Sequence, residues 1–94
     1  MRLRGRGVVV SGDLMPWYFD LEENGGKLMG ELRVEGWEPS GVMNSWYEST
    51  KGRMIDVVLQ GTGKAALAVQ GIRIHESGHH NETCISVKGS LLAA

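Results

Sequence analysis

A cluster of side chains with metal-binding chemistry lies in the C-terminal quarter of the sequence. All three histidines and the only cysteine fall within ten residues: His75, His79, His80 and Cys84. Imidazole and thiolate groups are the ligands that zinc and copper prefer. In a hairpin with its turn within residues 76–82, His75 and Cys84 could face each other, with His79 or His80 at the tip. The spacing matches no known metal-binding motif, so we expect no bound metal and no cofactor. A small metal-binding protein remains the alternative.

Aromatic side chains form the second candidate site. The residues are Trp17, Phe19, Trp37, Trp46 and Tyr47. Aromatic faces stack on flat groups such as sugars and bases. These five residues predict a binding site for a small apolar or aromatic ligand. The alternative is that the tryptophans fill the core or a subunit interface, because the chain has few other large aromatic residues.

Alternate positions near the start of the sequence carry arginines. Arg2, Arg4 and Arg6 project to one side if this segment is a strand. A guanidinium group can bind a phosphate through two parallel hydrogen bonds. Together with the aromatic residues, this arm predicts an alternative function, the binding of single-stranded nucleic acid or of a phosphate-bearing ligand. The simpler alternative is that the charges protect an exposed sheet edge.

Catalytic chemistry finds little support in the sequence. No nucleophile lies beside a base, and no two carboxylates have a spacing that suggests acid–base catalysis. The segment 61–64, Gly-Thr-Gly-Lys, resembles part of a phosphate-binding loop. However, Val58 and Ala65 stand where the full motif requires glycine and serine or threonine. We therefore expect a protein without enzymatic activity.

The composition is that of one globular domain covering residues 1–94. Ten basic and eleven acidic residues give a net charge of −1, which argues against nucleic acid or a membrane surface as the main partner. No apolar run approaches the ~20 residues of a membrane-spanning helix. A single cysteine fits a reducing compartment, so we expect a cytoplasmic protein.

A recurring pattern of alternating apolar residues, a polar residue and a glycine predicts an all-β fold. Residues 8–12, 32–36 and 85–89 are three of its copies. Alternation places apolar side chains on one face of a strand, and the glycine permits a turn or bulge. The predicted strands lie near 3–10, 16–22, 27–35, 42–48, 53–60, 64–75 and 83–92. We expect a bend at Gly71, and the stretch 38–45 could hold a short helical turn instead of a strand.

Seven sequential strands in so short a chain predict a small antiparallel β-meander that is closed or nearly closed into a barrel. Residues 17–21, Trp-Tyr-Phe-Asp-Leu, and 26–32, Gly-Lys-Leu-Met-Gly-Glu-Leu, resemble the opening of calycin-like barrels such as lipocalins and avidins. The resemblance implies a barrel with room for one small ligand, and it carries over no binding residue. The alternative fold is a five-stranded barrel of the OB or SH3 type.

Residues 42–48 predict contact with a second copy of the chain. As a strand, this segment would present no charged side chain before Glu48, and such strands are normally covered on both faces. We therefore expect a homo-oligomer, most simply a dimer, with Met43 and Tyr47 in the interface. The sequence as a whole predicts a non-catalytic binding or assembly module.

Overall fold

The computed structural model of the protein describes residues 1–9, 17–36, 40–77 and 80–92. Side chains are described throughout these ranges except at 8–9, 35–36, 40–42, 76–77 and 80–81. The elements are β1 (Arg2–Val9), β2 (Trp17–Asn24), β3 (Lys27–Gly36), α1 (Ser40–Thr50), β4 (Met54–Leu59), β5 (Gly63–Ser77) and β6 (His80–Leu91). Six of the seven predicted strands are therefore present.

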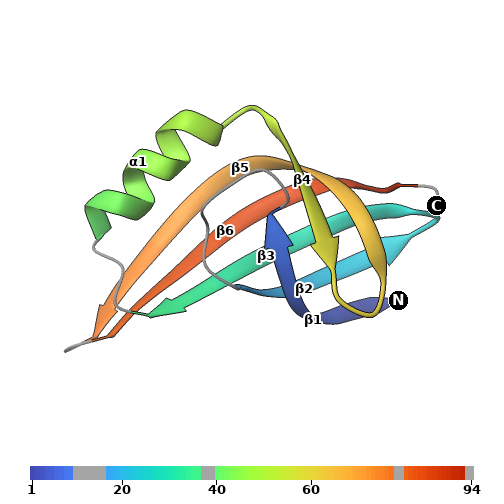
Figure 1. The fold of residues 1–94 in the computed structure, drawn as a ribbon, viewed down its shortest axis with the longest axis horizontal. Helices are drawn as coiled ribbons and strands as arrows, with labels where there is room; N and C mark the ends of the chain where they lie inside the picture. Colours follow the sequence, from blue (N-terminus) through green and yellow to red (C-terminus); the bar gives the residue numbers. More distant parts are fainter. Residues whose placement is uncertain (10–16, 37–39, 78–79, 93–94) are drawn as a thin grey trace.

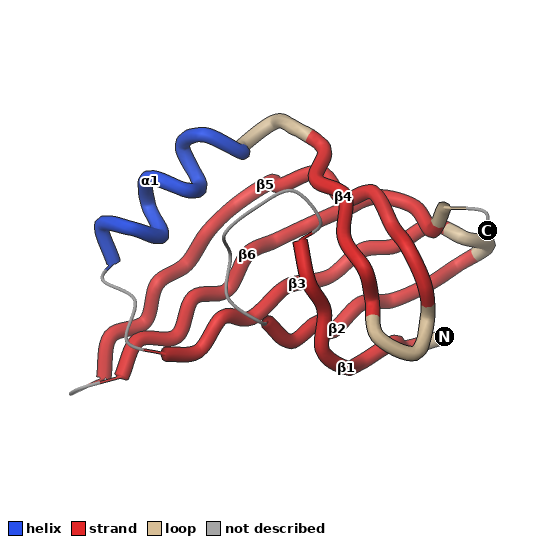
Figure 2. Tube along the Cα trace, in the orientation of Figure 1, coloured by secondary structure: helices blue, strands red, loops and turns tan. Residues whose placement is uncertain are grey.

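The strands close into a barrel in the order β1-β2-β3-β6-β5-β4, and each neighbouring pair is antiparallel (Figures 1 and 2). The chain forms two three-stranded meanders, β1–β3 and β4–β6, which α1 connects. The predicted all-β antiparallel barrel is confirmed. It is not one continuous meander, because α1 carries the chain from β3 to β4, which pairs with β1 on the other side of the ring.

The strand predicted at 42–48 is wrong, because these residues lie in α1. Met43, Trp46 and Tyr47 are three and four positions apart, which places them on one face of a helix. Met43 is buried, and the other two side chains pack partly buried against the core. These three side chains cover the protein's own barrel, whereas Asn44 and Ser45 between them are exposed. The predicted interface at 42–48 thus loses its basis, and the homo-oligomer stays a prediction.

β5 carries the predicted bend. Its pairing with β6 shifts register between Val69 and Gly71, so one extra residue is inserted into β5 at this point. Such bulges bend a strand and increase its twist. Beyond the bulge, β5 and β6 continue with β3 past the rest of the ring, and α1 lies alongside this extension (Figure 1).

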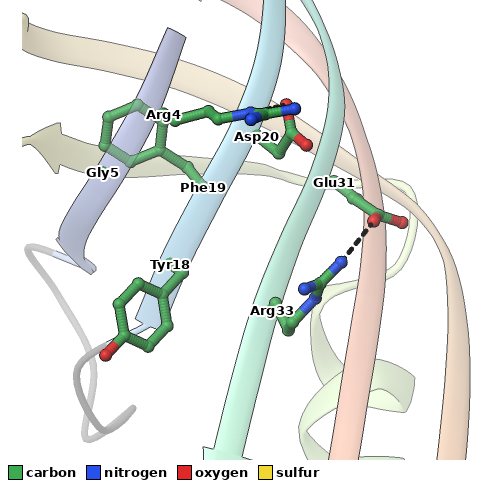
Figure 3. A pocket seen from close by; sticks show the side chains of 7 residues that line it. All are labelled: Arg4, Gly5, Tyr18, Phe19, Asp20, Glu31 and Arg33. Atoms are coloured by element: carbon green, nitrogen blue, oxygen red, sulfur yellow. Dashed lines mark hydrogen bonds and ion pairs between the residues drawn. The ribbon is translucent and has the colours of Figure 1, made fainter.

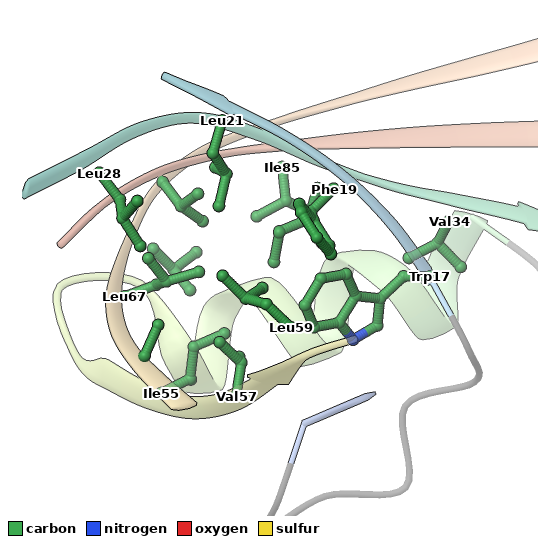
Figure 4. Packing of buried hydrophobic residues seen from close by; sticks show 14 of the residues in the cluster. Trp17, Phe19, Leu21, Leu28, Val34, Ile55, Val57, Leu59, Leu67 and Ile85 are labelled. Atoms are coloured by element: carbon green, nitrogen blue, oxygen red, sulfur yellow. The ribbon is translucent and has the colours of Figure 1, made fainter. Parts of the chain in front are cut away.

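The inner face of the barrel is filled by apolar side chains from β2 to β6 (Figure 4). Trp17 and Phe19 are buried side by side, with their ring centroids 6.3 Å apart and their planes at 71°. This edge-to-face arrangement is the one that the charge distribution of aromatic rings favours. The two aromatic residues therefore act as core residues of β2.

β1 leaves space for these rings. Its inward-facing positions include Gly5 and Gly7, which pair with Phe19 and Trp17 across the β1–β2 ladder. A Cβ atom on Gly7 would lie 2.5 Å from Cζ3 of Trp17, and one on Gly5 would lie 3.2 Å from Cζ of Phe19. The glycines of the arginine arm thus accommodate the two largest side chains of the core.

This packing predicts a strong coupling between Gly7 and Trp17. We expect Gly7→Ala to destabilise the protein by about 2 kcal/mol through overpacking. In a Trp17→Leu background the same change should cost much less, because the ring that it meets has been removed. Urea denaturation of the two single variants and the double variant measures this coupling. Equal costs of Gly7→Ala in both backgrounds would contradict the described contact.

Candidate functional site

The outer face of β1, β2 and β3 carries a groove with a volume of about 490 Å³ (Figure 3). This size falls within the range of small-molecule sites, roughly 300–1,000 Å³. Its lining residues are Arg4, Gly5, Tyr18, Phe19, Asp20, Glu31 and Arg33. All of them except Gly5 and Phe19 are polar or carry a polar group, so the groove is suited to a charged or polar ligand.

Strand register arranges the polar residues in two parallel rows. Arg4 pairs with Asp20, which pairs with Glu31. In the next row, Tyr18 pairs with Arg6 on one side and with Arg33 on the other. Directly opposed residues on neighbouring strands share a face of the sheet. The rows therefore bring together residues that lie far apart in the sequence.

Tyr18 provides an exposed aromatic surface within the second row. Its side chain is 42% exposed, although its neighbours Trp17 and Phe19 on β2 are buried. The guanidinium carbon of Arg6 lies 5.3 Å from the centre of the Tyr18 ring, and Nη2 of Arg6 donates a hydrogen bond to the phenol oxygen at 3.1 Å. This is a cation–π pair at the edge of the groove, because Tyr18 lines the groove and Arg6 lies just outside its lining.

Arginines bind the first carboxylate of the groove. Arg2 donates two hydrogen bonds to Asp20, at 2.7 and 2.9 Å, and Nε of Arg4 lies 3.5 Å from the same carboxylate. The hydrogen bonds from Arg2 hold the pKa of Asp20 below its usual value. Asp20 therefore stays ionised at neutral pH, and its charge is balanced by two guanidinium groups.

Glu31 holds two further arginines at the edge of the groove. Its Oε1 lies 3.4 Å from Nη2 of Arg33, and its Oε2 lies 3.5 Å from Nη2 of Arg73 on β5. Arg33 also approaches Glu82 on β6, at 3.5 Å, and the charge of Glu82 is the main cause that raises the pKa of Arg33. Arg6 has no ion pair with any described residue.

The predicted aromatic site does not form one cavity in the described part of the chain. Trp17 and Phe19 lie in the barrel core, and Trp46 and Tyr47 pack against the core from α1. Trp37 lies outside the described residues. Ligand binding by this set stays a prediction. The groove instead combines Arg4 of the predicted arm with Tyr18, Asp20, Glu31 and Arg33, which the sequence reasoning did not select.

The histidine–cysteine hairpin is arranged differently from the prediction. His75 pairs with Glu82, whereas Cys84 pairs with Arg33 and Arg73, so His75 and Cys84 are not directly opposite. Burial is the main cause that raises the pKa of the Cys84 thiol. His79 lies outside the described residues, as does the side chain of His80. Among all described residues, including those of this hairpin, no three histidine, cysteine or acidic side chains lie close enough together to hold a metal ion.

The described part of the chain contains no helix with the length and apolar character needed to cross a bilayer.

Comparison with protein-family models, curated proteins and solved structures found no match to the chain. The resemblance to calycin-like barrels thus rests on the sequence pattern alone. The structure itself supports a coarser class, a six-stranded antiparallel barrel with one helix.

Proposed function

We propose that the protein is a non-catalytic binding module whose groove on β1–β3 binds a planar ligand with a negative charge, such as a nucleotide. The pair of Arg6 and Tyr18 carries this proposal. It presents an aromatic surface beside an arginine without a carboxylate partner among the described residues. Arg4 and Arg33 also line the groove, where each lies beside a carboxylate, Asp20 and Glu31 respectively.

The chemistry of these groups fits a base attached to a phosphate. Stacking of a base on an aromatic side chain contributes about 1–3 kcal/mol, and a base can also stack on a guanidinium plane. Guanidinium groups bind phosphate oxygens through charge-assisted hydrogen bonds. The apolar filling of the barrel interior supports a ligand site on the outer face, since the side chains already occupy the space inside.

The state of the carboxylates supports binding over catalysis. A general acid or base works best when its pKa lies near the working pH. The hydrogen bonds from Arg2 lower the pKa of Asp20, which moves it away from that range. Glu31 is engaged by Arg33 and Arg73. In this proposal the carboxylates position the arginines.

Calorimetric titration with AMP, UMP and inorganic phosphate tests the proposal. We expect both nucleotides to bind more tightly than phosphate, because only they can stack. Tyr18→Ala should weaken nucleotide binding about tenfold through lost stacking. Arg6→Gln should weaken it by about the same factor through a lost charge-assisted hydrogen bond.

Two variants serve as matched controls. Arg53→Gln removes an exposed arginine that lies outside the groove, and Tyr47→Ala removes the tyrosine of α1. Circular dichroism checks that each variant is folded. We expect both controls to retain nucleotide binding. Loss of nucleotide binding in Tyr47→Ala, with unchanged binding in Tyr18→Ala, would contradict binding in the groove and place the site at α1.

A further inference from the structure

A second groove continues the same outer face of the barrel. It has a volume of about 500 Å³ and lies on β5 and β6. Its lining residues are Arg73, Ile74, His75, Glu82 and Cys84. β3 and β6 are neighbours in the ring, so the two grooves adjoin across the β3–β6 pair.

One row of directly paired residues crosses both grooves. In strand order β1-β2-β3-β6-β5, its members are Arg6, Tyr18, Arg33, Cys84 and Arg73. The row contains three arginines and no carboxylate, although the chain has a net charge of −1. Its ends, Arg6 and Arg73, are both exposed. Three guanidinium groups thus follow one line across the strands, and the carboxylates of Glu31 and Glu82 lie beside two of them, Arg33 and Arg73.

The length of this row exceeds that of one nucleotide. Five neighbouring strands give four spacings of about 4.8 Å, which is roughly 19 Å. A strand with the base spacing of B-DNA advances about 3.4 Å per nucleotide, so about six nucleotides would span the row. Small barrels that bind single strands have sites of about 4–16 nucleotides. The row therefore falls within the size range of such sites.

We propose that the two grooves form one site for single-stranded nucleic acid, which lies across β1, β2, β3, β6 and β5. This inference rests on the proposed function, and it extends the ligand from one nucleotide to a strand. Tyr18 stacks with a base, and Arg6, Arg33 and Arg73 contact successive parts of the phosphate backbone. Glu31 and Glu82 hold the arginines of β3 and β5 in place, at 3.4–3.5 Å.

Fluorescence anisotropy with labelled oligothymidylates of one to eight nucleotides tests this inference. We expect affinity to rise with length up to about six nucleotides and then to level off, as the row is filled. Arg73→Gln should weaken binding of the six-nucleotide strand about fivefold or more and change binding of thymidine monophosphate by no more than about twofold. Tyr18→Ala should weaken both. Lys64→Gln, an exposed change on β5 outside the row, is the control.

Salt dependence gives a second readout. Each phosphate contact with a single strand contributes about −0.7 to the slope of log K against log salt concentration. Three arginine contacts predict a slope of about −2 for the six-nucleotide strand, and Arg73→Gln should reduce its magnitude by about 0.7. Lys64→Gln should leave the slope unchanged.

The possible results separate this inference from the proposed function. Binding of the mononucleotide without any effect of length or of Arg73→Gln would overturn the extended site and leave the proposed function in place. Absence of binding to every nucleotide probe would overturn both. A hexaglutamate peptide that competes as well as the oligonucleotide, with no effect of Tyr18→Ala, would overturn the nucleic-acid site in favour of an acidic protein segment.

Discussion

Gly89→Ala is expected to destabilise the barrel by about 3 kcal/mol or more, out of a typical total of about 5–15 kcal/mol. A Cβ atom at this position would meet the carbonyl oxygen of Ala66 and lie 2.9 Å from Cα of Leu67. Both atoms belong to the backbone of β5, so no side-chain rotation can relieve the contact. β6 pairs with β3 on one side and β5 on the other, and a displacement of β6 would disturb both pairings.

Gly71→Ala is the matched control for this variant. A Cβ atom on Gly71 would lie 3.8 Å from the side chain of Ser86, which is an ordinary contact distance. Urea denaturation monitored by circular dichroism gives the free energy of unfolding of both variants. We expect a change within about 1 kcal/mol for Gly71→Ala. Equal losses for the two variants would contradict the close approach of β6 to β5 at Gly89.

Val87→Asp is expected to unfold the domain at neutral pH. Val87 is 1% exposed and pairs with Val69, which is also 1% exposed. A buried charge without a partner costs about 3–5 kcal/mol, which is a large part of the stability of a small domain. The far-ultraviolet circular dichroism spectrum should lose its strand signal, and the thermal transition should disappear.

Val58→Asp makes the same chemical change at a position on the outside. Val58 is 38% exposed and pairs with Lys64, so the new carboxylate remains solvated and gains an oppositely charged neighbour. We expect its thermal transition to remain cooperative, with a change in stability within about 0.5 kcal/mol. A cooperative transition in Val87→Asp as well would contradict the position of that residue in the core.

Local alternation was enough to find most of the barrel. Val57, Leu59, Ile85 and Val87 alternate with more exposed positions, and each lies buried in a strand. This pattern arises because neighbouring side chains of a strand point to opposite faces. The ring order could not be predicted in the same way. The two meanders are joined by the pairs β1–β4 and β3–β6. These pairs form between distant parts of the chain, so no short segment predicts them.

The helix was expected only as an alternative, a short turn within 38–45, because its pattern fits two periods. Met43 and Tyr47 are four positions apart, so they lie on one face of a strand as well as on one face of a helix. Trp46 distinguishes the two structures, because it joins their face only in a helix. The absence of charge in residues 42–47 does not distinguish the two structures, because it fits a strand covered on both faces as well as this helix.

The groove was predictable only in part. The arginine arm placed Arg4 and Arg6 on one face of a strand, as the structure has them. Tyr18 and Arg33 are fifteen positions apart in the sequence and meet only through the register of β2 and β3. Trp17 and Phe19 were predicted as ligand contacts, but the glycines opposite them on β1 leave the space that their rings fill in the core.

Glu31 links the two grooves energetically. One of its carboxylate oxygens faces Arg33 and the other faces Arg73, so a single negative charge is divided between two cations. An anion that bound one of these arginines would leave Glu31 paired with the other arginine alone. That remaining ion pair would be stronger, so a second anion would break it less easily. Two separate small anions would therefore bind with negative cooperativity, and by thermodynamic linkage each would weaken the other equally. A single ligand that engages both arginines must also displace Glu31 from both, so it meets the same total cost in one binding event.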